Sequence, residues 1–336
     1  MKRIFGVMLI AFCLTLVSCA PACETNESFA MNTIITQTVY TSNTQVISQN
    51  NQIIRDIENK MSKTIPTSDI GKLNHRSGEN IAISSETAQV LHCALIAAAD
   101  TDGAFSPALG GVIDAWGFGT ENAHVPDSAE LEKLLSSADY RAVQEAAYDA
   151  NIANAGGALI DLGGAVKGYA LDMLAQNLSA NNVSSAILSL GGSIYATGKK
   201  PDNTSYKIGI RDPYATENDY MAVISTDGVF VSTSGIYERG FTENGKYYHH
   251  IIDPKTGFPV ENGLAAVTVI ADSGIMSDIY STALFVMGAE RGVAFAEAHG
   301  ADALFLTSDR QIITTADFAK KYDLQIKGQW QSADNR

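Results

Sequence analysis

Cysteine is scarce in this sequence, and the few cysteines do not form a pattern typical of metal or redox sites. Four occur among 336 residues, with no Cys-x-x-Cys pair and no cysteine–histidine spacing suited to a metal. Cys93 lies within an apolar helical pattern, which is typical of a small buried hydrophobic residue. Nothing in the sequence indicates that Cys93 pairs with Cys23. Zinc binding and thiol redox chemistry are therefore not expected.

Positive charge is also in short supply. The chain has 23 basic against 37 acidic residues, which gives a formal net charge of −14. No run of Lys and Arg of the kind that neutralises phosphates occurs, so nucleic acid is not an expected partner. An acidic protein that binds a phosphorylated ligand needs another source of positive charge, such as a metal ion or a helix N-terminus.

Long hydrophobic runs are missing, apart from a short one near the start. The segment from Ile4 to Val17 is almost entirely apolar, but it is shorter than the roughly 20 apolar residues that span a bilayer as a helix. It follows Lys2 and Arg3, and this arrangement is typical of a secretory signal. We therefore expect residues 1–18 to be a signal peptide.

The apolar run ends in Leu16-Val17-Ser18-Cys19, which resembles a bacterial lipobox. In such signals the cysteine is acylated, and two or three acyl chains hold a protein on a membrane better than one. The alternative is an ordinary signal peptide that ends near a cysteine by chance. We expect a lipid on Cys19, a polar tether over residues 19–28, and a location in the bacterial cell envelope, anchored to the inner membrane and facing the periplasm.

The rest of the chain mixes helix and strand patterns without strict alternation, which favours an α+β fold. Apolar spacing and capping residues predict helices at 42–61, 70–74, 84–100, 129–135, 166–177, 276–287 and 291–299. Strands are predicted at 29–40, 158–161, 185–190, 206–211, 221–225, 229–232, 264–271, 303–307 and 311–314.

A predicted strand, a pair of glycines and a predicted helix follow one another in Asp161-Leu-Gly-Gly-Ala-Val-Lys-Gly-Tyr169. Glycines at such a junction let a ligand approach the backbone closely, and the free N–H groups of the helix N-terminus favour phosphate. Lys167 adds the positive charge that the acidic chain otherwise lacks. The segment is neither a Walker loop nor a dinucleotide fingerprint, and an ordinary structural turn is equally consistent with these residues alone.

Two adjacent histidines precede a turn in His249-His250-Ile-Ile-Asp253-Pro-Lys-Thr-Gly257. In an extended segment neighbouring side chains face opposite sides, so at most one histidine serves a given site. A lone histidine is more often structural than catalytic. A histidine beside an aspartate and a tight turn is better placed to act as a general base.

Asp278 and Thr282 are spaced four residues apart in a predicted helix, so they share one helix face. A carboxylate and a hydroxyl are oxygen ligands suited to Mg²⁺. A surface aspartate and an ordinary helical threonine are the alternative. The apolar residues around them indicate a packed helix, in which a buried aspartate needs a partner.

These three segments, in this order, resemble those of the ApbE family of FAD:protein FMN transferases. Their joint order and spacing are specific, and the resemblance extends over nearly all of the chain after the signal. It implies one two-lobed α+β domain over residues 29–336, with mixed sheets, packed helices and an FAD cleft between the lobes. Shorter segments that add to the resemblance are Met31-Asn-Thr33, Gly103-Ala-Phe-Ser-Pro107, Trp116-Gly-Phe-Gly119, Ser189-Leu-Gly-Gly-Ser193 and Ser232-Thr-Ser-Gly235.

The resemblance also implies a set of site residues. His250 corresponds to the family's catalytic histidine. Mg²⁺ is expected at the backbone carbonyl of Gly164 and the side chains of Asp278 and Thr282, with Ser281 adjacent. The residues expected to contact FAD are Met31, Thr64, Ala104, Phe105, Ser106, Asp161, Lys167 and the backbone of Ile252.

The implied activity is Mg²⁺-dependent transfer of FMN from FAD to a Thr or Ser hydroxyl of an exported flavoprotein, such as a membrane redox-pump subunit, with release of AMP. An FAD pyrophosphatase, which uses water in place of the hydroxyl, is one alternative. A flavin-binding lipoprotein without catalysis is another, but such a protein would not need the set of His250, Asp278 and Thr282.

Three positions depart from the family's pattern. Asn32 replaces the usual glycine of a Met-Gly-Thr turn, and asparagine tolerates positive φ better than most residues. Thr64 stands where many members carry an aromatic side chain that stacks on the cofactor. Ile236 stands where an aspartate often follows Ser-Gly. These differences bear on FAD affinity and on the balance between transfer and hydrolysis.

Overall fold

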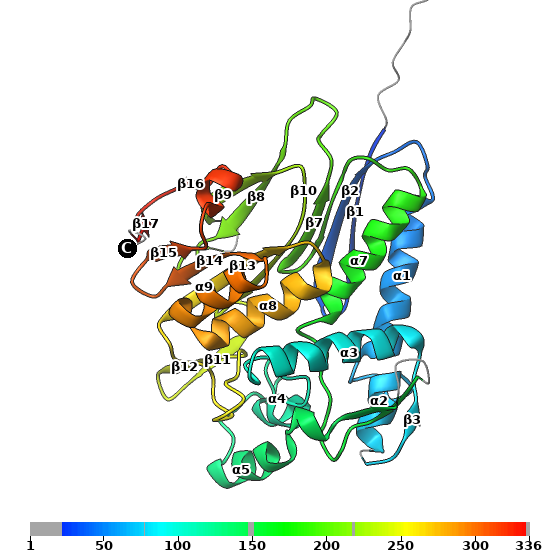
Figure 1. The fold of residues 1–336 in the computed structure, drawn as a ribbon, viewed down its shortest axis with the longest axis vertical. Coiled ribbons are helices and arrows are strands. Elements are labelled where there is room, and N and C mark those ends of the chain that lie inside the picture. The colour runs from blue at the N-terminus through cyan, green and yellow to red at the C-terminus, as the bar shows by residue number, and fades with distance from the viewer. Residues whose placement is uncertain (1–21, 77, 147–150, 217–218, 334–336) are drawn as a thin grey trace, which may run out of the picture.

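A nine-stranded sheet forms the centre of the molecule (Figure 1). The computed structural model describes residues 22–76, 78–146, 151–216 and 219–333. Neighbouring strands of this sheet are antiparallel, except for the parallel last pair. In spatial order the strands are β1 (Cys23–Ala30), β2 (Thr33–Tyr40), β6 (Ala186–Leu190), β7 (Ser193–Thr197), β10 (Gly228–Gly235), β13 (Leu264–Ala271), β14 (Asp302–Thr307), β15 (Gln311–Thr314) and β17 (Gln331–Ser332).

Four helices pack side by side over one face of this sheet (Figure 1). They are α1 (Val46–Met61), α7 (Val166–Ala180), α8 (Gly274–Met287) and α9 (Ala289–Ala298). The opposite face is covered by a three-stranded sheet of β8 (Tyr206–Arg211), β9 (Tyr220–Thr226) and β16 (Gln325–Ile326).

Strand β13 shows the effect of these two layers. Val267 and Val269 pack into the core beneath the helices, whereas Ala266 and Ile270 pack against the small sheet. Because both faces are covered, β13 is buried along almost its whole length. A continuous apolar run, rather than alternation, is the pattern expected of a strand buried on both sides.

Further helices and short strands form the lower part of the molecule in Figure 1. A hairpin of β11 (Gly240–Glu243) and β12 (Lys246–His249) leads directly to His250. The remaining elements are α2 (Asp69–His75), α3 (Ser85–Asp100), α4 (Gly110–Trp116), α5 (Ser128–Ser137), the 3₁₀ turn Tyr140–Ala142, and the small sheet of β3 (Ile81–Ala82), β5 (Ile152–Asn154) and β4 (Gln144–Ala146); α10 (Phe318–Lys321) lies near the chain end.

Aromatic side chains fix the β11–β12 hairpin to α4. The ring of Trp116 lies 5.4 Å from Phe118, 6.2 Å from Phe241, 5.4 Å from Tyr248 and 5.5 Å from Phe258, measured between centroids. Ring pairs at these distances contribute attraction beyond the burial of their area. The hairpin, and with it His250, is therefore held in place by packing as well as by its strand hydrogen bonds.

The observed elements confirm the α+β fold and correct the sequence prediction in several places, of which three bear on the site or the tether. Residues 23–28, expected in the tether, belong to β1, because every one of them pairs with β2. The strand predicted at 29–40 is broken by a turn in which Met31 and Asn32 have φ of 51° and 56°, values typical of a tight hairpin turn. The strand predicted at 158–161 makes only an isolated bridge, between Leu159 and Leu109.

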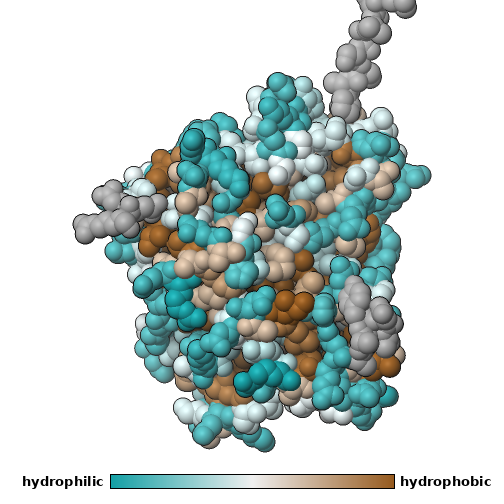
Figure 2. All heavy atoms as spheres, in the orientation of Figure 1, coloured by the Kyte–Doolittle hydropathy of each residue, from teal (hydrophilic) through white to brown (hydrophobic). Residues whose placement is uncertain are grey.

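None of the helices in the described ranges is both long and apolar enough to cross a membrane. On the face shown in Figure 2, apolar groups occupy separate areas between polar ones. Cys23 is exposed and Cys93 is half-buried rather than fully buried, and both are free thiols. The predicted signal peptide and Cys19 lie outside the described residues.

Candidate active site

The predicted site residues meet at one cavity of about 310 Å³. It lies where the β1–β2 turn, the start of α7, the middle of α8 and the end of the β11–β12 hairpin come together. Its lining includes all but two of the expected residues: Met31, Ala104, Phe105, Ser106, Asp161, Gly164, Lys167, His250, Ile252, Asp278 and Thr282.

Two of the expected residues do not line the cavity. Thr64 is exposed, and its hydroxyl lies 2.9 Å from that of Ser62. Ser281 is buried; its hydroxyl donates to the backbone carbonyl of Asp278 and lies 2.8 Å from the hydroxyl of Ser234. The structure therefore brings neither the Thr64 nor the Ser281 side chain to the cavity lining.

The glycine-rich junction before α7 brings the backbone close to α8. A side chain on Gly164 would place its Cβ 3.0 Å from the ring of Phe105 and 3.5 Å from Oγ1 of Thr282. Gly164 and Thr282 are thus neighbours in the cavity wall, and it is the Phe105 ring that leaves little room for a side chain at Gly164. Lys167 belongs to this wall. The N–H groups of Val166 and Gly168 at the start of α7 already donate, to the carbonyl of Leu162 and to Asp278, both at 3.0 Å.

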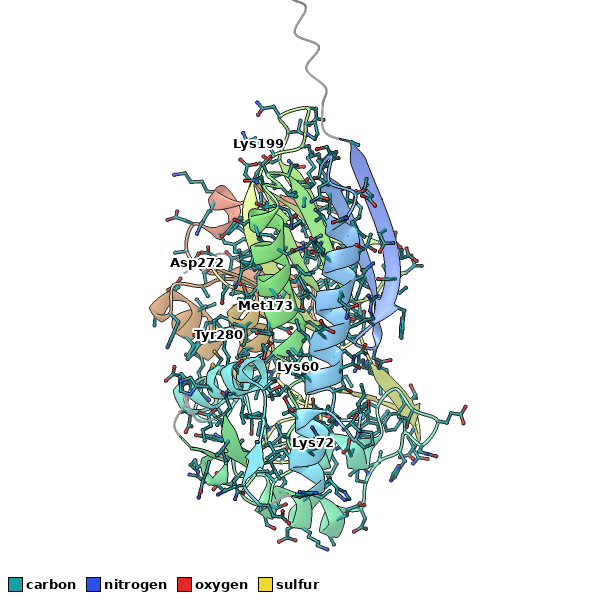
Figure 3. The ribbon with its side chains drawn as sticks, turned by 90° about the vertical axis from the view of Figure 1, so that its right-hand side faces the viewer. Lys60, Lys72, Met173, Lys199, Asp272 and Tyr280 are labelled. Carbon is teal, nitrogen blue, oxygen red and sulfur yellow. The ribbon has the colours of Figure 1, made fainter. Side chains whose placement is uncertain are left out.

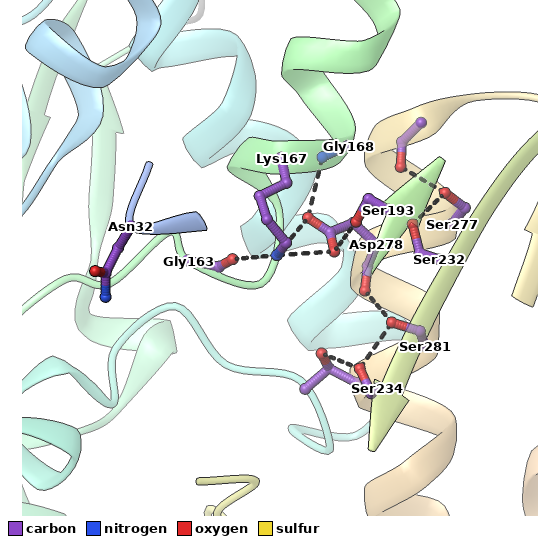
Figure 4. Close-up of polar contacts among 12 residues, drawn as sticks. Asn32, Gly163, Lys167, Gly168, Ser193, Ser232, Ser234, Ser277, Asp278 and Ser281 are labelled. Carbon is purple, nitrogen blue, oxygen red and sulfur yellow. Dashed lines mark hydrogen bonds and ion pairs between the residues drawn. The ribbon is translucent and has the colours of Figure 1, made fainter. Parts of the chain in front are cut away.

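Asp278 is almost fully buried, with 4% of its surface exposed. Its carboxylate accepts hydrogen bonds from the N–H of Gly168 at 3.0 Å and the hydroxyl of Ser193 at 3.2 Å (Figure 4). Nζ of Lys167 lies 3.3 Å and 3.5 Å from its two oxygens. These partners supply what a buried carboxylate needs, as the packed helix pattern led us to expect.

A close crossing of α7 and α8 sets this geometry. A Cβ on Gly168 would lie 2.1 Å from the carbonyl oxygen of Gly274, and a Cβ on Gly274 would lie 2.2 Å from that of Gly168. Asp172 on α7 accepts hydrogen bonds from the N–H groups of Gly274 and Ile275 at the start of α8. The two helices therefore meet through glycines and a cap, which places Asp278 against the first turn of α7.

The two adjacent histidines have different surroundings, as expected for neighbours in an extended segment. His249 is buried, and its Nε2 donates to the carbonyl of Val260 at 3.0 Å, while its Nδ1 accepts from the N–H of Ile251 at 3.3 Å. Burial lowers the pKa of His249. Since both ring nitrogens of the neutral form are satisfied, His249 has a structural role.

His250 lines the cavity instead. Its Nδ1 lies 3.2 Å from the carbonyl oxygen of Arg239, an atom that can only accept a hydrogen bond. Nδ1 therefore carries the proton, and Nε2 keeps the free lone pair. Burial, assisted by the charge of Arg239, lowers the pKa of His250 to about 4. The imidazole is thus neutral at pH 7 and able to accept a proton.

Arg239 and Lys63 are site residues that the sequence reasoning missed. Lys63 pairs with Asp161 at 2.8 Å and with Asp114 at 2.7 Å, and so holds a carboxylate that lines the cavity. Arg239 lines the cavity and lies opposite His250 because the β11–β12 hairpin pairs Gly240 with His249. The sequence did carry a signal for this hairpin.

That signal is the dipeptide Asn244-Gly245, which joins the two strands with φ of 50° and 78°. Asn-Gly between two alternating segments is a strong short-range indication of a hairpin. Pairing the residues around this turn would have placed Arg239 beside His250.

The donor set beside α8 fits Mg²⁺. A backbone carbonyl, a carboxylate and a hydroxyl are hard oxygen ligands, and Mg²⁺ usually takes one or two carboxylates and completes its shell with water and substrate phosphate. Within the described part of the chain, no group of three or more His, Cys, Asp and Glu side chains could hold a metal. An ion at Asp278 would therefore be held by Gly164, Asp278 and Thr282 together with ligands from outside the protein.

The sequence is similar to a known protein family and to named members of it. The ApbE family model matches residues 31–305. FAD:protein FMN transferase of Treponema pallidum is 34% identical over 281 residues, which cover 79% of this chain and 77% of that protein. FAD:protein FMN transferase of Klebsiella pneumoniae is 32% identical over 79% of this chain and 83% of its own length.

The fold comparison agrees. The crystal structure of the ApbE protein of Thermotoga maritima superposes with a TM-score of 0.83 at 31% identity, over 90% of this chain and 99% of that one. The sequence match, the shared fold and the cavity that collects the predicted residues lead to one conclusion: the chain belongs to the ApbE family.

Proposed function

We propose that this protein is an Mg²⁺-dependent FAD:protein FMN transferase. It binds FAD in the cavity, cleaves the pyrophosphate, and joins the FMN half to a Thr or Ser hydroxyl of an acceptor protein, with AMP as the other product. The observation that carries the proposal is the position of a neutral His250 on the same cavity as Lys167, the start of α7, and the oxygen donors of Asp278 and Thr282.

Each of these groups has a task in the transfer. Lys167, whose side chain lines the cavity, holds the phosphates of FAD. His250 Nε2 takes the proton from the acceptor hydroxyl while the hydroxyl oxygen attacks the phosphorus of the FMN half. The bond between that phosphorus and the bridging oxygen breaks, and AMP leaves with that oxygen.

A divalent ion at Asp278 would supply neutralisation of the phosphate charge. Lys63 contributes indirectly, because it fixes the orientation of Asp161, whose other oxygen accepts a hydrogen bond from the N–H of Gly163 at 2.7 Å. The Phe105 ring and the Met31 side chain offer apolar surface to the flavin or adenine ring.

The proposal includes the setting of the reaction. A lipid on Cys19 would anchor the protein to the inner membrane, facing the periplasm, and β1 begins only four residues further on. Acceptors would then be exported flavoproteins, such as subunits of membrane redox pumps. Radiolabelled palmitate incorporation into the wild-type protein, compared with Cys19→Ala, tests the anchor, and labelling of the variant would contradict it.

The activity is tested with purified protein, FAD, Mg²⁺ and an acceptor peptide that carries a Ser/Thr-Gly-Ala-Thr-like sequence. Flavin fluorescence on the acceptor together with AMP release supports the transferase. AMP release without a labelled acceptor shows a pyrophosphatase instead. FAD that is bound but not cleaved would contradict both catalytic functions.

A further inference from the structure

Lys167 occupies an unusual position for a phosphate-binding lysine. Its ammonium lies 3.2 Å from the carbonyl oxygen of Gly163 and 3.3 Å and 3.5 Å from the carboxylate oxygens of Asp278 (Figure 4). The Asp278 side chain is 6% exposed, whereas 24% of the Lys167 side chain is exposed and it lines the cavity. The ammonium of Lys167 thus pairs with a buried carboxylate, while the lysine side chain also lines the cavity.

The oxygens around this ammonium are of the same kind as those that would hold a divalent cation. One is the carbonyl oxygen of Gly163 in the glycine junction, and the others are the carboxylate oxygens of Asp278 on α8. The glycine junction and α8 also supply the proposed metal ligands. The remaining contacts of the Asp278 carboxylate are hydrogen bonds from the Gly168 N–H and the Ser193 hydroxyl. These neutral donors do not take the place of Lys167 or of a metal ion. The carboxylate therefore has one cation already, supplied by the protein itself.

Two cations on one buried carboxylate repel each other. The interaction between charges grows as water is excluded, and Asp278 is almost completely removed from water. A divalent ion that binds the Asp278 carboxylate must either displace the Lys167 ammonium or bind more weakly because of that repulsion. Once displaced, the flexible lysine side chain needs a new anionic partner.

We propose that Lys167 is an internal cation that competes with the divalent metal for Asp278, and that the FAD phosphate is its alternative partner. This inference rests on the proposed function. Phosphate draws Lys167 from Asp278 and so favours the metal; the metal releases Lys167 and so favours FAD. The two ligands bind cooperatively because linkage is reciprocal.

The Gly168 N–H and Ser193 hydroxyl keep the Asp278 carboxylate in place during this exchange. They contact separate oxygens, Oδ2 and Oδ1, and both come from rigid elements, the first turn of α7 and the start of β7. Only the lysine side chain has to move. The protein then keeps the metal site neutralised until FAD arrives.

Direct measurement of Mn²⁺ binding tests the competition without any turnover. Mn²⁺, a stand-in for Mg²⁺, is titrated into the protein without FAD and followed by electron paramagnetic resonance of the free ion. Lys167→Met and Lys167→Gln both remove the competing charge, and the amide of the second can still donate to Asp278. We expect both to bind Mn²⁺ about tenfold more tightly than the wild type, within the range of coupling between linked sites.

Lys60→Met is the matched control for loss of one positive charge. Lys60 lies on α1 (Figure 3) and pairs with Glu86 at 2.6 Å. This variant is expected to bind Mn²⁺ as the wild type does. A second titration, of FAD in EDTA followed by quenching of flavin fluorescence, should show weaker FAD binding in the two Lys167 variants only.

The outcomes separate this inference from the proposed function. If the wild type binds Mn²⁺ and both neutral variants, shown to be folded by circular dichroism, bind it no more tightly, the competition is wrong and the metal site stands. If neither the wild type nor any variant binds Mn²⁺, the competition and the metal site are both wrong.

Discussion

The carbonyl oxygen of Arg239 accepts two hydrogen bonds from His250, one from the main-chain N–H at 3.1 Å and one from Nδ1 at 3.2 Å. A backbone atom thus sets both the orientation of the ring and its tautomer. The β11–β12 hairpin creates this arrangement, since it brings the residue before β11 opposite the residue after β12. The free Nε2 that results is the basis of the proposed proton transfer.

His250→Asn is expected to lower the rate of FMN transfer by about 10²- to 10⁴-fold, the range that a positioned general base contributes. FAD affinity should change little, because the phosphate and metal groups are untouched. Single-turnover labelling of the acceptor and flavin fluorescence quenching measure the two properties separately. Transfer close to the wild-type rate in this variant would show that His250 is not the base.

Stability should fall in mild acid because of His250. Its pKa is about 4 in the folded protein and about 6.5 when unfolded. A lowered folded pKa gives stability that is fully present above the unfolded value and is lost as the pH falls from about 6.5 towards 4. His249 acts in the same direction, and Asp172, whose pKa burial raises, acts in the opposite one.

The difference between the wild type and His250→Asn isolates this effect, since His249 and Asp172 are common to both proteins. Urea unfolding at pH 7.5, 6 and 5 provides the free energies of unfolding. We expect the wild type to lose more stability than the variant between the first and last pH. Parallel losses in the two proteins would show that His250 does not titrate with a lowered pKa.

Gly168→Ala should disturb the crossing of α7 and α8. The new Cβ would meet the carbonyl of Gly274 at 2.1 Å, a backbone atom that cannot step aside without moving α8. We expect a loss of about 1–3 kcal/mol in the free energy of unfolding, as for other overpacked sites, and weaker Mn²⁺ binding because Asp278 shifts with its helix.

Gly111→Ala in α4 is the matched control. The atoms nearest to its Cβ would be side-chain atoms of Leu134 and Leu159, at 3.2 Å and 3.6 Å, rather than backbone. Replacing a helical glycine with alanine under such conditions is neutral or stabilising by up to about 1 kcal/mol. Equal losses in the two variants would contradict the role given to the Gly168–Gly274 contact.

Buried amides form a further element of the fold that can be tested. Asn50 on α1 is fully buried; it donates to Gln37 on β2 at 2.8 Å and accepts from Asn177 on α7 at 2.8 Å. Asn50→Leu leaves both partners unsatisfied, which costs about 1–3 kcal/mol for each such group. Thermal unfolding should show a clear loss relative to Gln52→Leu, whose residue is exposed on the same helix; no difference would mean that water replaces the lost bonds.

Local structure was predictable where a short segment carries its own signal. Ser84 caps α3, Asp127 caps α5 and Ser68 caps α2, and each of these helices begins where the capping residue indicates. The turn at Asn32 also survives, since asparagine adopts the positive φ that the tight turn needs. The strand order could not be predicted in this way, because it depends on pairings between segments that are distant in the sequence, such as β10 with β7 and β13.

In the site, too, features within one segment could be predicted, and contacts between distant segments could not. Asp278 and Thr282 share a helix face, which their spacing predicts, and His250 rather than His249 faces the cavity, which alternation allows. The ion pair of Lys167 with Asp278 spans 111 residues and arises only from the way α7 and α8 cross. Thr64 lies outside the cavity lining for a related reason: the chain after α1 leaves its side chain exposed and pairs Lys63 with Asp161 instead.

The central claim is that the oxygen donors on α8 serve the cleavage of FAD in this cavity. Release of AMP from FAD by the wild type and by Asp278→Ala, with Mg²⁺ or EDTA, tests it most directly. Lys60→Met and the wild type should release AMP only with Mg²⁺, and Asp278→Ala should release none above the EDTA level. Full Mg²⁺-dependent AMP release by Asp278→Ala would contradict the account.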